Sequence, residues 1–262
     1  MHRPGHTAPE TDHVAVEEPM EVRVNGASFA VIMRTPGADR DLAAGFLLAE
    51  DVIRGVDEIG IIEYCQDTTA EGRDNTINVT VTGAAVERLA ARLGERRQVM
   101  MTASCGLCGR LTIESLKSRI QAVRGNWTVG ADMIAALPDR LRAAQSVFDS
   151  TGGLHAAGLF DRNGVLQFAA EDVGRHNAVD KICGRTLLMG QHPLDASILL
   201  VSGRTSFELV QKALLAGIPI IAAVSAPSSL AIELAESSGI TLCGFVRNGN
   251  FNVYTHDSRL RS

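Results

Sequence analysis

The sequence predicts an α/β fold, with a mixed sheet and parallel crossovers in the C-terminal half and a smaller β-rich N-terminal portion. Short apolar runs at 198–201, 220–224 and 241–246 alternate with helix-like segments at 207–216 and 230–236. Continuous apolar runs of this length are typical of strands covered on both faces, and a helix between two such strands makes a parallel crossover. In the first third, apolar and polar residues alternate instead, which predicts strands with one buried face.

The N-terminal portion is expected to open with a β-hairpin. Apolar residues alternate at 20–24 and at 29–33, on either side of Asn25-Gly26. This dipeptide favours a tight hairpin turn because both residues tolerate positive φ. A segment of helical composition follows at 39–53.

A second strand and a second helix are predicted before the middle of the chain. Apolar residues alternate with polar ones over 77–82, and an apolar face spaced for a helix spans 86–93. We expect Gly94 to end that helix, because the segment 95–109 keeps neither a helical nor a strand period. A further helix is predicted at 112–120.

The second half begins with another predicted hairpin, in which 154–160 and 165–169 flank Asn163-Gly164. Helices are predicted at 140–148, before this hairpin, and at 173–189, after it. Together with the alternating strands and helices, this divides the chain into four expected parts, which are a disordered tail at 1–13, a β-rich portion at 14–100, a loop and helix at 101–124, and an α/β domain at 125–262.

Composition excludes several classes of function. The net charge of −5 argues against a general nucleic-acid binder, because phosphate contacts normally require a basic face. No apolar stretch approaches the roughly 20 residues that a membrane helix needs. The first 12 residues carry no apolar signal core, and an odd number of cysteines, five, fits a reducing compartment. We therefore expect a cytoplasmic protein without a membrane anchor.

The strongest local signal is a pair of cysteines, Cys105 and Cys108, flanked by Gly106 and Gly109. Thiolates at this spacing suit three chemistries: persulfide sulfur transfer, dithiol redox exchange and zinc binding. A redox pair usually follows a strand, and zinc needs four ligands, whereas no second pair of ligands accompanies this one. A zinc deaminase would need a His-x-Glu motif, which His155 does not provide.

The other three cysteines, Cys65, Cys183 and Cys243, lie on predicted apolar elements. Free cysteine behaves as a small hydrophobic residue and is often fully buried. We expect no functional role for them.

Two loops follow predicted parallel strands, at 202–205 and 225–229. Ligands of open α/β sheets bind beyond the carboxyl ends of the strands, and helix N-termini there attract phosphate or other anions. Arg204 would be a bidentate partner for such an anion. Ordinary helix capping by serine explains the same residues equally well.

The densest polar cluster spans 171–180 and contains Asp172, His176 and Asp180 at helical spacing. These side chains would lie near one helix face and could form a site. Alternatively, Asp172 would cap the helix and the others would form a solvated face. The residues alone leave both interpretations open.

Several of these blocks together resemble the FdhD family, the formate dehydrogenase accessory sulfurtransferases. The resemblance runs from about residue 17 to about residue 256 and rests on the segments 104–109, 171–181, 201–204, 217–219 and 225–229. The resemblance implies a fold similar to that of cytidine deaminases without their metal site, and a homodimer. It also implies no tightly bound metal.

The resemblance also implies an activity. A cysteine desulfurase would load persulfide sulfur onto Cys105, with Cys108 as its partner thiol. The sulfur would pass to Mo-bis(molybdopterin guanine dinucleotide), the cofactor of the formate dehydrogenase catalytic subunit. The residues matched to cofactor binding are Phe245, Val246, Arg247, Asn248, Gly249 and Asn250, joined by Ser202, Gly203, Arg204, Ser225 and His176.

Two alternatives stay open. A non-catalytic chaperone for the molybdenum cofactor would need the loops and Arg247 but neither thiol. A dithiol oxidoreductase would use Cys105 and Cys108 to reduce disulfides with turnover.

Overall fold

The computed structural model describes residues 11–66, 74–102, 123 and 127–261, and of 95–102 only the backbone. The N-terminal elements are β1 (Glu18–Val24), β2 (Ala27–Arg34), α1 (Asp39–Ala49), η1 (Val56–Glu58), β3 (Ile59–Tyr64), β4 (Thr76–Val81) and α2 (Ala84–Thr102). The later elements are β5 (Val129–Gly130), α4 (Ala131–Arg142), α5 (Ser146–Thr151), β6 (His155–Phe160), β7 (Leu166–Asp172), α6 (Arg175–Leu188), β8 (Ile198–Val201), α7 (Phe207–Leu215), β9 (Ile220–Ala223), α8 (Ser229–Ser238), β10 (Thr241–Arg247), β11 (Asn250–Thr255), η3 (Asp257–Arg259) and β12 (Leu260–Arg261).

The first sheet is four-stranded, in the order β2-β1-β4-β3. Strands β1 and β2 form the predicted hairpin, and Asn25 and Gly26 at its tip have φ of 50° and 81°. Strand β4 pairs parallel to β1 and antiparallel to β3. The strand predicted at 77–82 is confirmed, with its apolar residues buried.

The second sheet is six-stranded and mixed, in the order β11-β10-β9-β8-β6-β7. The predicted parallel pairing of β8, β9 and β10 is confirmed. Strand β6 runs antiparallel to both β7 and β8, and β11 runs antiparallel to β10. Strands β5 and β12 form a separate two-stranded sheet.

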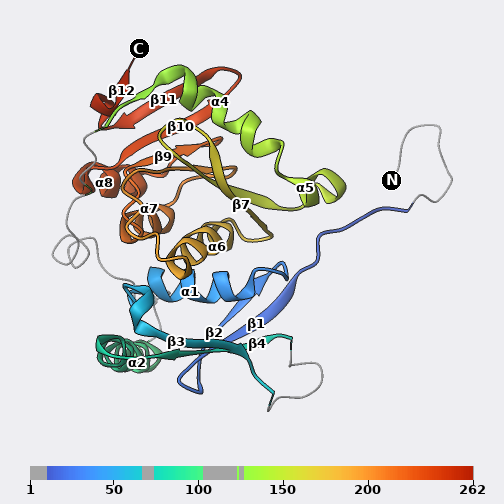
Figure 1. The fold of residues 1–262 in the computed structure, drawn as a ribbon, viewed down its shortest axis with the longest axis vertical. Coiled ribbons are helices and arrows are strands. Elements are labelled where there is room, and N and C mark those ends of the chain that lie inside the picture. Colours follow the sequence, from blue (N-terminus) through green and yellow to red (C-terminus); the bar gives the residue numbers. More distant parts are fainter. Residues whose placement is uncertain (1–10, 67–73, 103–122, 124–126, 262) are drawn as a thin grey trace.

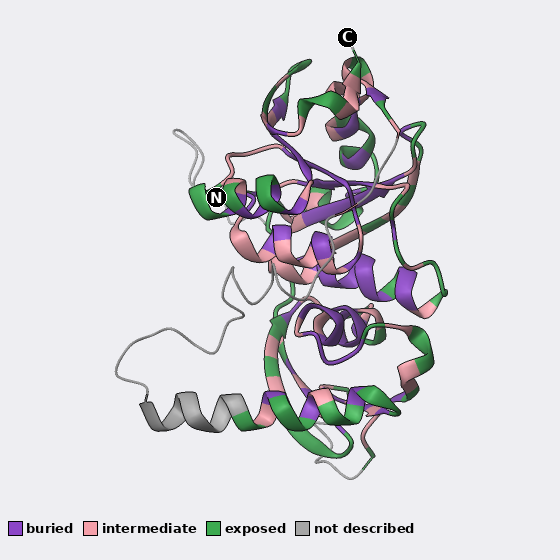
Figure 2. Cartoon of the chain, turned by 90° about the vertical axis from the view of Figure 1, so that its left-hand side faces the viewer, coloured by how far each residue is buried: buried purple, intermediate pink, exposed green. Residues whose placement is uncertain are grey.

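The layers alternate between sheet and helix, and α1 lies between the two halves (Figure 1). Leu199 and Val201 of β8 join a large core with α1, α6, α7 and the first sheet. Their neighbours Ile198 and Leu200 join a second core under α4. Both faces of β8 are therefore covered, which explains its continuous apolar run. Buried residues continue across the boundary between the halves (Figure 2).

Helices α1 and α6 touch through two glycines. A Cβ atom built on Gly45 would lie 1.9 Å from the carbonyl oxygen of Asp180, and one on Gly184 would lie 1.8 Å from that of Asp41. Glycine alone allows this backbone approach, because any other side chain would overlap the facing helix.

Two predictions of helix boundaries are wrong. Helix α2 continues through Gly94 to Thr102. The helix predicted at 140–148 is in fact two helices: α4 includes Pro138 and ends at Arg142, and α5 starts at Ser146. Three buried residues at helical spacing, Ile134, Leu137 and Leu141, pack α4 onto the sheet and outweigh the unfavourable proline.

The helix predicted at 112–120 lies outside the described residues, as do residues 103–109 of the loop predicted at 95–109, whereas 95–102 belong to α2. None of the helices in the described ranges is long and apolar enough to cross a membrane.

Candidate functional site

Three loops meet at the carboxyl ends of the parallel strands, and we call this region the strand-end site. The loops are 202–206, after β8, 225–228, after β9, and the β10–β11 turn. The first two are joined by a parallel bridge between Thr205 and Pro227. The Thr205 N–H donates to the carbonyl oxygen of Ala226 at 3.2 Å, and the Ser228 N–H donates to that of Thr205 at 2.9 Å.

The β10–β11 hairpin is the third part of the strand-end site. Phe245 has a φ of 54°, and its N–H donates to the carbonyl oxygen of Ser225 at 3.2 Å. Asn248 and Gly249 have φ of 52° and 74°, values typical of a type I′ turn. The sequence analysis named these residues but did not predict the hairpin.

Side chains of this hairpin differ in what they can contact. Arg247 is exposed, and its guanidinium lies 5.4 Å from the centroid of the Phe245 ring. Asn250 is also exposed and donates to the carbonyl oxygen of Asn248. Val246 is fully buried in the core under α4, so its side chain cannot touch a ligand at this edge.

The two helix N-termini at the strand-end site are capped differently. The Ser228 hydroxyl accepts a hydrogen bond from the Ala231 N–H at 3.3 Å and so caps α8. Ser206 stands at the same position before α7 but makes no side-chain cap. Its hydroxyl lies 3.1 Å from Nε2 of His176 instead. Ordinary serine capping therefore accounts for the second loop and not for the first.

His176, Ser206 and Glu208 do not have the arrangement of a catalytic triad. Its Nε2 atom lies 3.1 Å from the Ser206 hydroxyl and 3.2 Å from Oε2 of Glu208. A proton relay of the serine hydrolase kind requires the two ring nitrogens to contact different partners. Here one nitrogen faces both, which suits hydrogen bonding to a ligand or to the loop.

The remaining predicted loop residues lie as follows. Ser202 accepts a hydrogen bond from the Ala156 N–H at 2.9 Å, so its hydroxyl holds β6 against the loop. Gly203 is buried, Arg204 is exposed, and Ser225 is half-buried. The strand-end site thus brings together Ser202, Gly203, Arg204, Ser225, His176 and the exposed part of the hairpin.

The expected common face of Asp172, His176 and Asp180 does not exist. Helix α6 begins at Arg175, so Asp172 is the last residue of β7 and lies outside the helical period. It is not the helix cap either, because Gly174 holds that position. Asp180 is buried and pairs with Lys212 of α7 at 2.7 and 2.8 Å.

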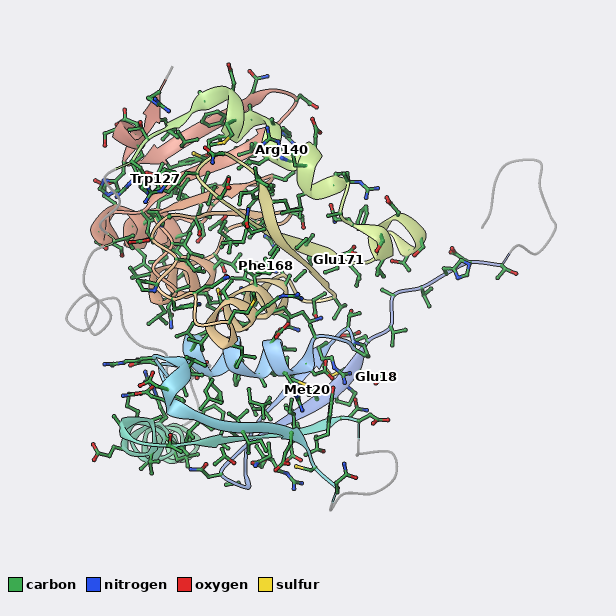
Figure 3. The ribbon with its side chains drawn as sticks, viewed as in Figure 1. Glu18, Met20, Trp127, Arg140, Phe168 and Glu171 are labelled. Atoms are coloured by element: carbon green, nitrogen blue, oxygen red, sulfur yellow. The ribbon has the colours of Figure 1, made fainter. Side chains whose placement is uncertain are left out.

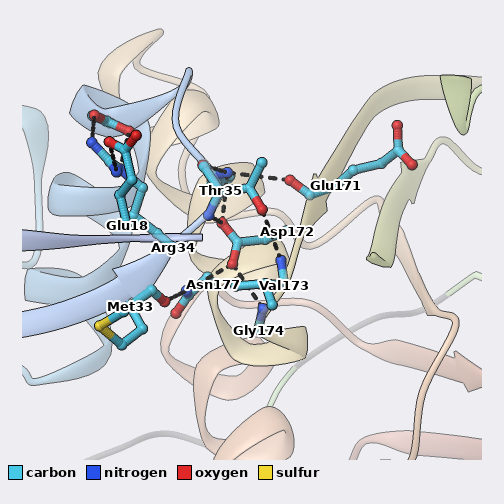
Figure 4. Close-up of polar contacts among 11 residues, drawn as sticks. Glu18, Met33, Arg34, Thr35, Glu171, Asp172, Val173, Gly174 and Asn177 are labelled. Atoms are coloured by element: carbon cyan, nitrogen blue, oxygen red, sulfur yellow. Dashed lines mark hydrogen bonds and ion pairs between the residues drawn. The ribbon is translucent and has the colours of Figure 1, made fainter. Parts of the chain in front are cut away.

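Asp172 joins the two halves of the molecule (Figure 4). Its Oδ2 atom accepts from the Thr35 N–H at 3.1 Å and pairs with Nζ of Lys181 at 2.7 Å. Its Oδ1 atom accepts from the Gly174 N–H and from Asn177, both at 2.8 Å. With four donors on a fully buried carboxylate, this residue has a structural role.

Other ion pairs and ring contacts lie away from the strand-end site. Figure 3 labels Glu18 and Met20 in the first sheet and Trp127, Arg140 and Glu171 in the second half. Glu18 pairs with buried Arg34, and the Trp127 ring nitrogen donates to the carbonyl oxygen of Asp195.

Both residues of the cysteine pair, Cys105 and Cys108, lie outside the described residues. Of the others, Cys183 and Cys243 are buried as expected, and burial raises the pKa of each thiol to about 12. Cys65 is only half-buried, so the expectation of burial is wrong for it. It follows directly after β3, at an edge of the first sheet.

Within the described ranges, no group of three or more His, Cys, Asp or Glu residues could hold a metal ion. Two polar atoms close to the strand-end site are buried and lack a hydrogen-bond partner among those residues: Nε of Arg175 and Oγ1 of Thr205. Both lie in segments named from the sequence, 171–180 and 202–205, but neither was predicted as a site residue. Only three-dimensional packing distinguishes them from their neighbours.

Comparisons with known proteins agree over nearly the whole chain. The model of the FdhD/NarQ family matches residues 15–261. The sulfur carrier protein FdhD of Streptomyces avermitilis is 48% identical over 266 residues, covering 98% of this chain and 92% of that protein. The protein of the same name from Mycobacterium tuberculosis is 49% identical over 259 residues, covering 97% and 93%.

A solved structure has the same fold. The crystal structure of a candidate formate dehydrogenase accessory protein from Desulfotalea psychrophila matches with a TM-score of 0.77 and 28% identity, covering 99% of this chain and 95% of that one. The additional likeness to cytidine deaminases stays a prediction.

Proposed function

Because the chain belongs to the FdhD/NarQ family, we propose that it is a sulfur carrier that serves formate dehydrogenase as an accessory protein. One observation carries the proposal: proteins named sulfur carrier protein FdhD are about half identical to it over nearly its full length. More specifically, we propose a persulfide sulfurtransferase that works through Cys105 and Cys108.

In the first step, sulfur is loaded. The Cys105 thiolate attacks the terminal sulfur of a persulfide on a cysteine desulfurase. A new S–S bond forms on Cys105 as the S–S bond of the desulfurase breaks, and the desulfurase cysteine leaves as a thiolate. No net oxidation or reduction takes place.

In the second step, sulfur is released. The Cys108 thiolate attacks Sγ of Cys105, which forms a disulfide between the two and expels the terminal sulfur as hydrosulfide. That sulfur is reduced by two electrons, which the two cysteines supply. A cellular dithiol must then reduce the disulfide before the next cycle. The hydrosulfide is the species passed to the cofactor.

The described cysteines favour this assignment to Cys105 and Cys108. Only a thiolate is nucleophilic, and burial holds the thiols of Cys183 and Cys243 in the protonated form at neutral pH. Cys65 is the one described thiol with partial access to solvent. It serves as the matched control in the experiment below.

Chain connectivity allows the cysteine pair to reach the strand-end site. The Val123 N–H donates to the carbonyl oxygen of Ser238, the last residue of α8. Helix α8 begins at the strand-end site and is about 15 Å long. The chain between Cys108 and Val123 can span at most roughly 50 Å. The covalent tether is therefore long enough for delivery there.

We propose that the strand-end site binds Mo-bis(molybdopterin guanine dinucleotide) as the sulfur acceptor. The exposed guanidinium groups of Arg204 and Arg247 suit the phosphates of a dinucleotide, and the Phe245 ring offers an apolar surface beside them. The N-terminus of α7 adds an anion-attracting dipole. A desulfurase, the formate dehydrogenase catalytic subunit and a second copy of this chain are the proposed partners.

Mass spectrometry after incubation with a cysteine desulfurase and free cysteine tests the loading step. We expect a gain of about 32 Da, one sulfur atom, on the peptide that contains Cys105. Cys105→Ser should abolish this adduct, and Cys65→Ser should leave it intact. An adduct that survives Cys105→Ser, or none on the wild-type protein, would contradict the assignment.

Formate dehydrogenase activity in cells distinguishes carrier from chaperone. In a strain that lacks its own carrier, we expect Cys105→Ser with Cys108→Ser to give no active enzyme. Full activity with this double variant would indicate a chaperone that needs no thiol. Turnover of a model disulfide by the purified wild-type protein, without sulfur loading, would indicate an oxidoreductase instead.

A further inference from the structure

We propose that Arg175 and Thr205 form a buried subsite for a phosphate group, deeper than the rim at Arg204 and Arg247. The inference rests on the proposed function, because the phosphate belongs to the guanine dinucleotide. It adds two residues to those that the resemblance matched to cofactor binding: Arg175 lies in the polar cluster 171–180 and Thr205 in the loop 202–205.

Two buried polar groups near this loop lack a hydrogen-bond partner among the described residues. Thr205 is 1% exposed, and its hydroxyl has no hydrogen-bond partner among the described residues. Nε of Arg175 is buried and equally unmatched within the same residues. Buried polar groups are almost always paired, and leaving one unpaired destabilises the fold. Two such groups beside the same loop indicate a ligand that pairs with them when bound.

The first turn of α6 places Arg175 against the loop that carries Thr205. Cδ of Arg175 lies 3.5 Å from the place that a Cβ on Gly203 would occupy, so its stem runs over that glycine. His176, the next residue, reaches Ser206 at 3.1 Å. The first turn of α6 therefore contacts the loop at Gly203 and at Ser206, and Thr205 lies between these two contacts.

The charges around Arg175 favour an anion. No carboxylate among the described residues pairs with Arg175, whereas the nearby Asp172 already has four donors. His155 also faces Gly203, at 3.4 Å from its Cβ position, and burial and Arg175 lower the pKa of its imidazole. It is therefore neutral at neutral pH. Glu208 is also acidic, and it faces His176 at 3.2 Å.

These groups select a phosphate over other ligands. A guanidinium, a threonine hydroxyl and the N-terminus of α7 supply donors, which match the acceptor oxygens of phosphate. A metal ion would need acceptors, and no such cluster exists within the described ranges. An uncharged ligand would leave the arginine unpaired. We therefore assign the subsite to a phosphate of the dinucleotide.

Calorimetric titration with GDP and with inorganic pyrophosphate, at fixed ionic strength, tests the subsite. We expect Thr205→Val and Arg175→Gln each to weaken binding at least about tenfold, the effect of losing a hydrogen bond to a charged group. Arg185→Gln removes the same charge from the far end of α6, where Arg185 packs over Phe168, and should leave affinity unchanged.

Thr205→Val also separates a ligand role from a structural one. Valine has nearly the same shape and lacks the unmatched hydroxyl, so the ligand-free variant should unfold at the same midpoint as wild type or a higher one. A lower midpoint would mean that another part of the chain satisfies the hydroxyl, and would overturn the proposal. Unchanged affinity in this variant would overturn it too.

Failure here can be told apart from failure of the proposed function. If wild type binds GDP or pyrophosphate and the variants bind equally well, only the deep subsite is wrong. If wild type binds neither probe, the strand-end site has no phosphate role and the subsite falls with it. The desulfurase experiment on Cys105 is unaffected by either result.

Discussion

Substituting Gly184 by alanine tests the contact between α1 and α6. The new Cβ would lie 1.8 Å from the carbonyl oxygen of Asp41 and 2.5 Å from the nitrogen of Gly45, whereas Cβ contacts under 3.0 Å essentially never occur. The two helices must therefore separate by more than about 1 Å, and both obstacles are backbone atoms that no rotamer change can move. Overpacking of this kind costs roughly 1–3 kcal/mol, occasionally more.

We expect a loss of about 3 kcal/mol in the free energy of unfolding. Alanine also lowers the conformational entropy of the unfolded chain, which stabilises the folded state by at most ~1 kcal/mol and offsets only part of the steric cost. Urea unfolding followed by circular dichroism measures the difference. Gly94→Ala is the matched control, because Gly94 is an exposed position in α2 with nothing within 4 Å, and alanine there should stabilise the helix by ~0.5–1 kcal/mol. Equal stability of Gly184→Ala and wild type would refute the close helix contact.

Three other predictions concern buried groups. Asp172→Asn should lower the free energy of unfolding by about 3–5 kcal/mol, because Lys181 then loses its buried counter-charge; adding Lys181→Met should recover part of this loss, and no recovery would contradict the pairing. Burial raises the pKa of Asp180 to about 6, above its unfolded value near 4, so the folded state binds that proton more tightly. This contribution to stability is complete below about pH 4 and is lost as the pH rises through about 6. The free energy of unfolding, measured at several pH values between about 4 and 6, should therefore fall as the pH rises. Asp180→Asn should remove this fall, and a fall that persists in the variant would assign it to another group. Iodoacetamide at neutral pH should leave Cys183 and Cys243 of the native protein unlabelled, as read by peptide mass spectrometry; labelling of either would contradict their burial.

Sequence patterns within a single segment predicted the structure correctly where interactions inside that segment determine it. Asn25-Gly26 and Asn163-Gly164 mark two hairpin turns: both residues of the first pair have positive φ, and in the second pair Gly164 has a φ of 72°. The continuous apolar run at 198–201 identified a strand covered on both faces. Serine and arginine after that strand then indicated the strand-end site, because strand order alone brings those loops together.

Sequence patterns failed to predict the structure where packing against residues far away in the chain determines it. Pro138 is a helix breaker by propensity, and only the sheet beneath α4 compensates for it. Asp172 lies at helical spacing from Asp180, yet its partner Thr35 is 137 residues away along the chain. No pattern within one segment contains that information. That the described residues offer the Thr205 hydroxyl no partner is likewise a property of its surroundings and not of its residue type.

The position of α1 between the two sheets has a consequence for biosynthesis. Its outer surface is covered by α6, which begins more than 120 residues later in the chain. At a translation rate of roughly 5–20 residues per second, that surface emerges from the ribosome on the order of ten seconds before its cover does. We expect nascent chains that stop short of residue 175 to be captured by holdase chaperones and complete chains to be released, which cross-linking of stalled ribosome complexes would reveal.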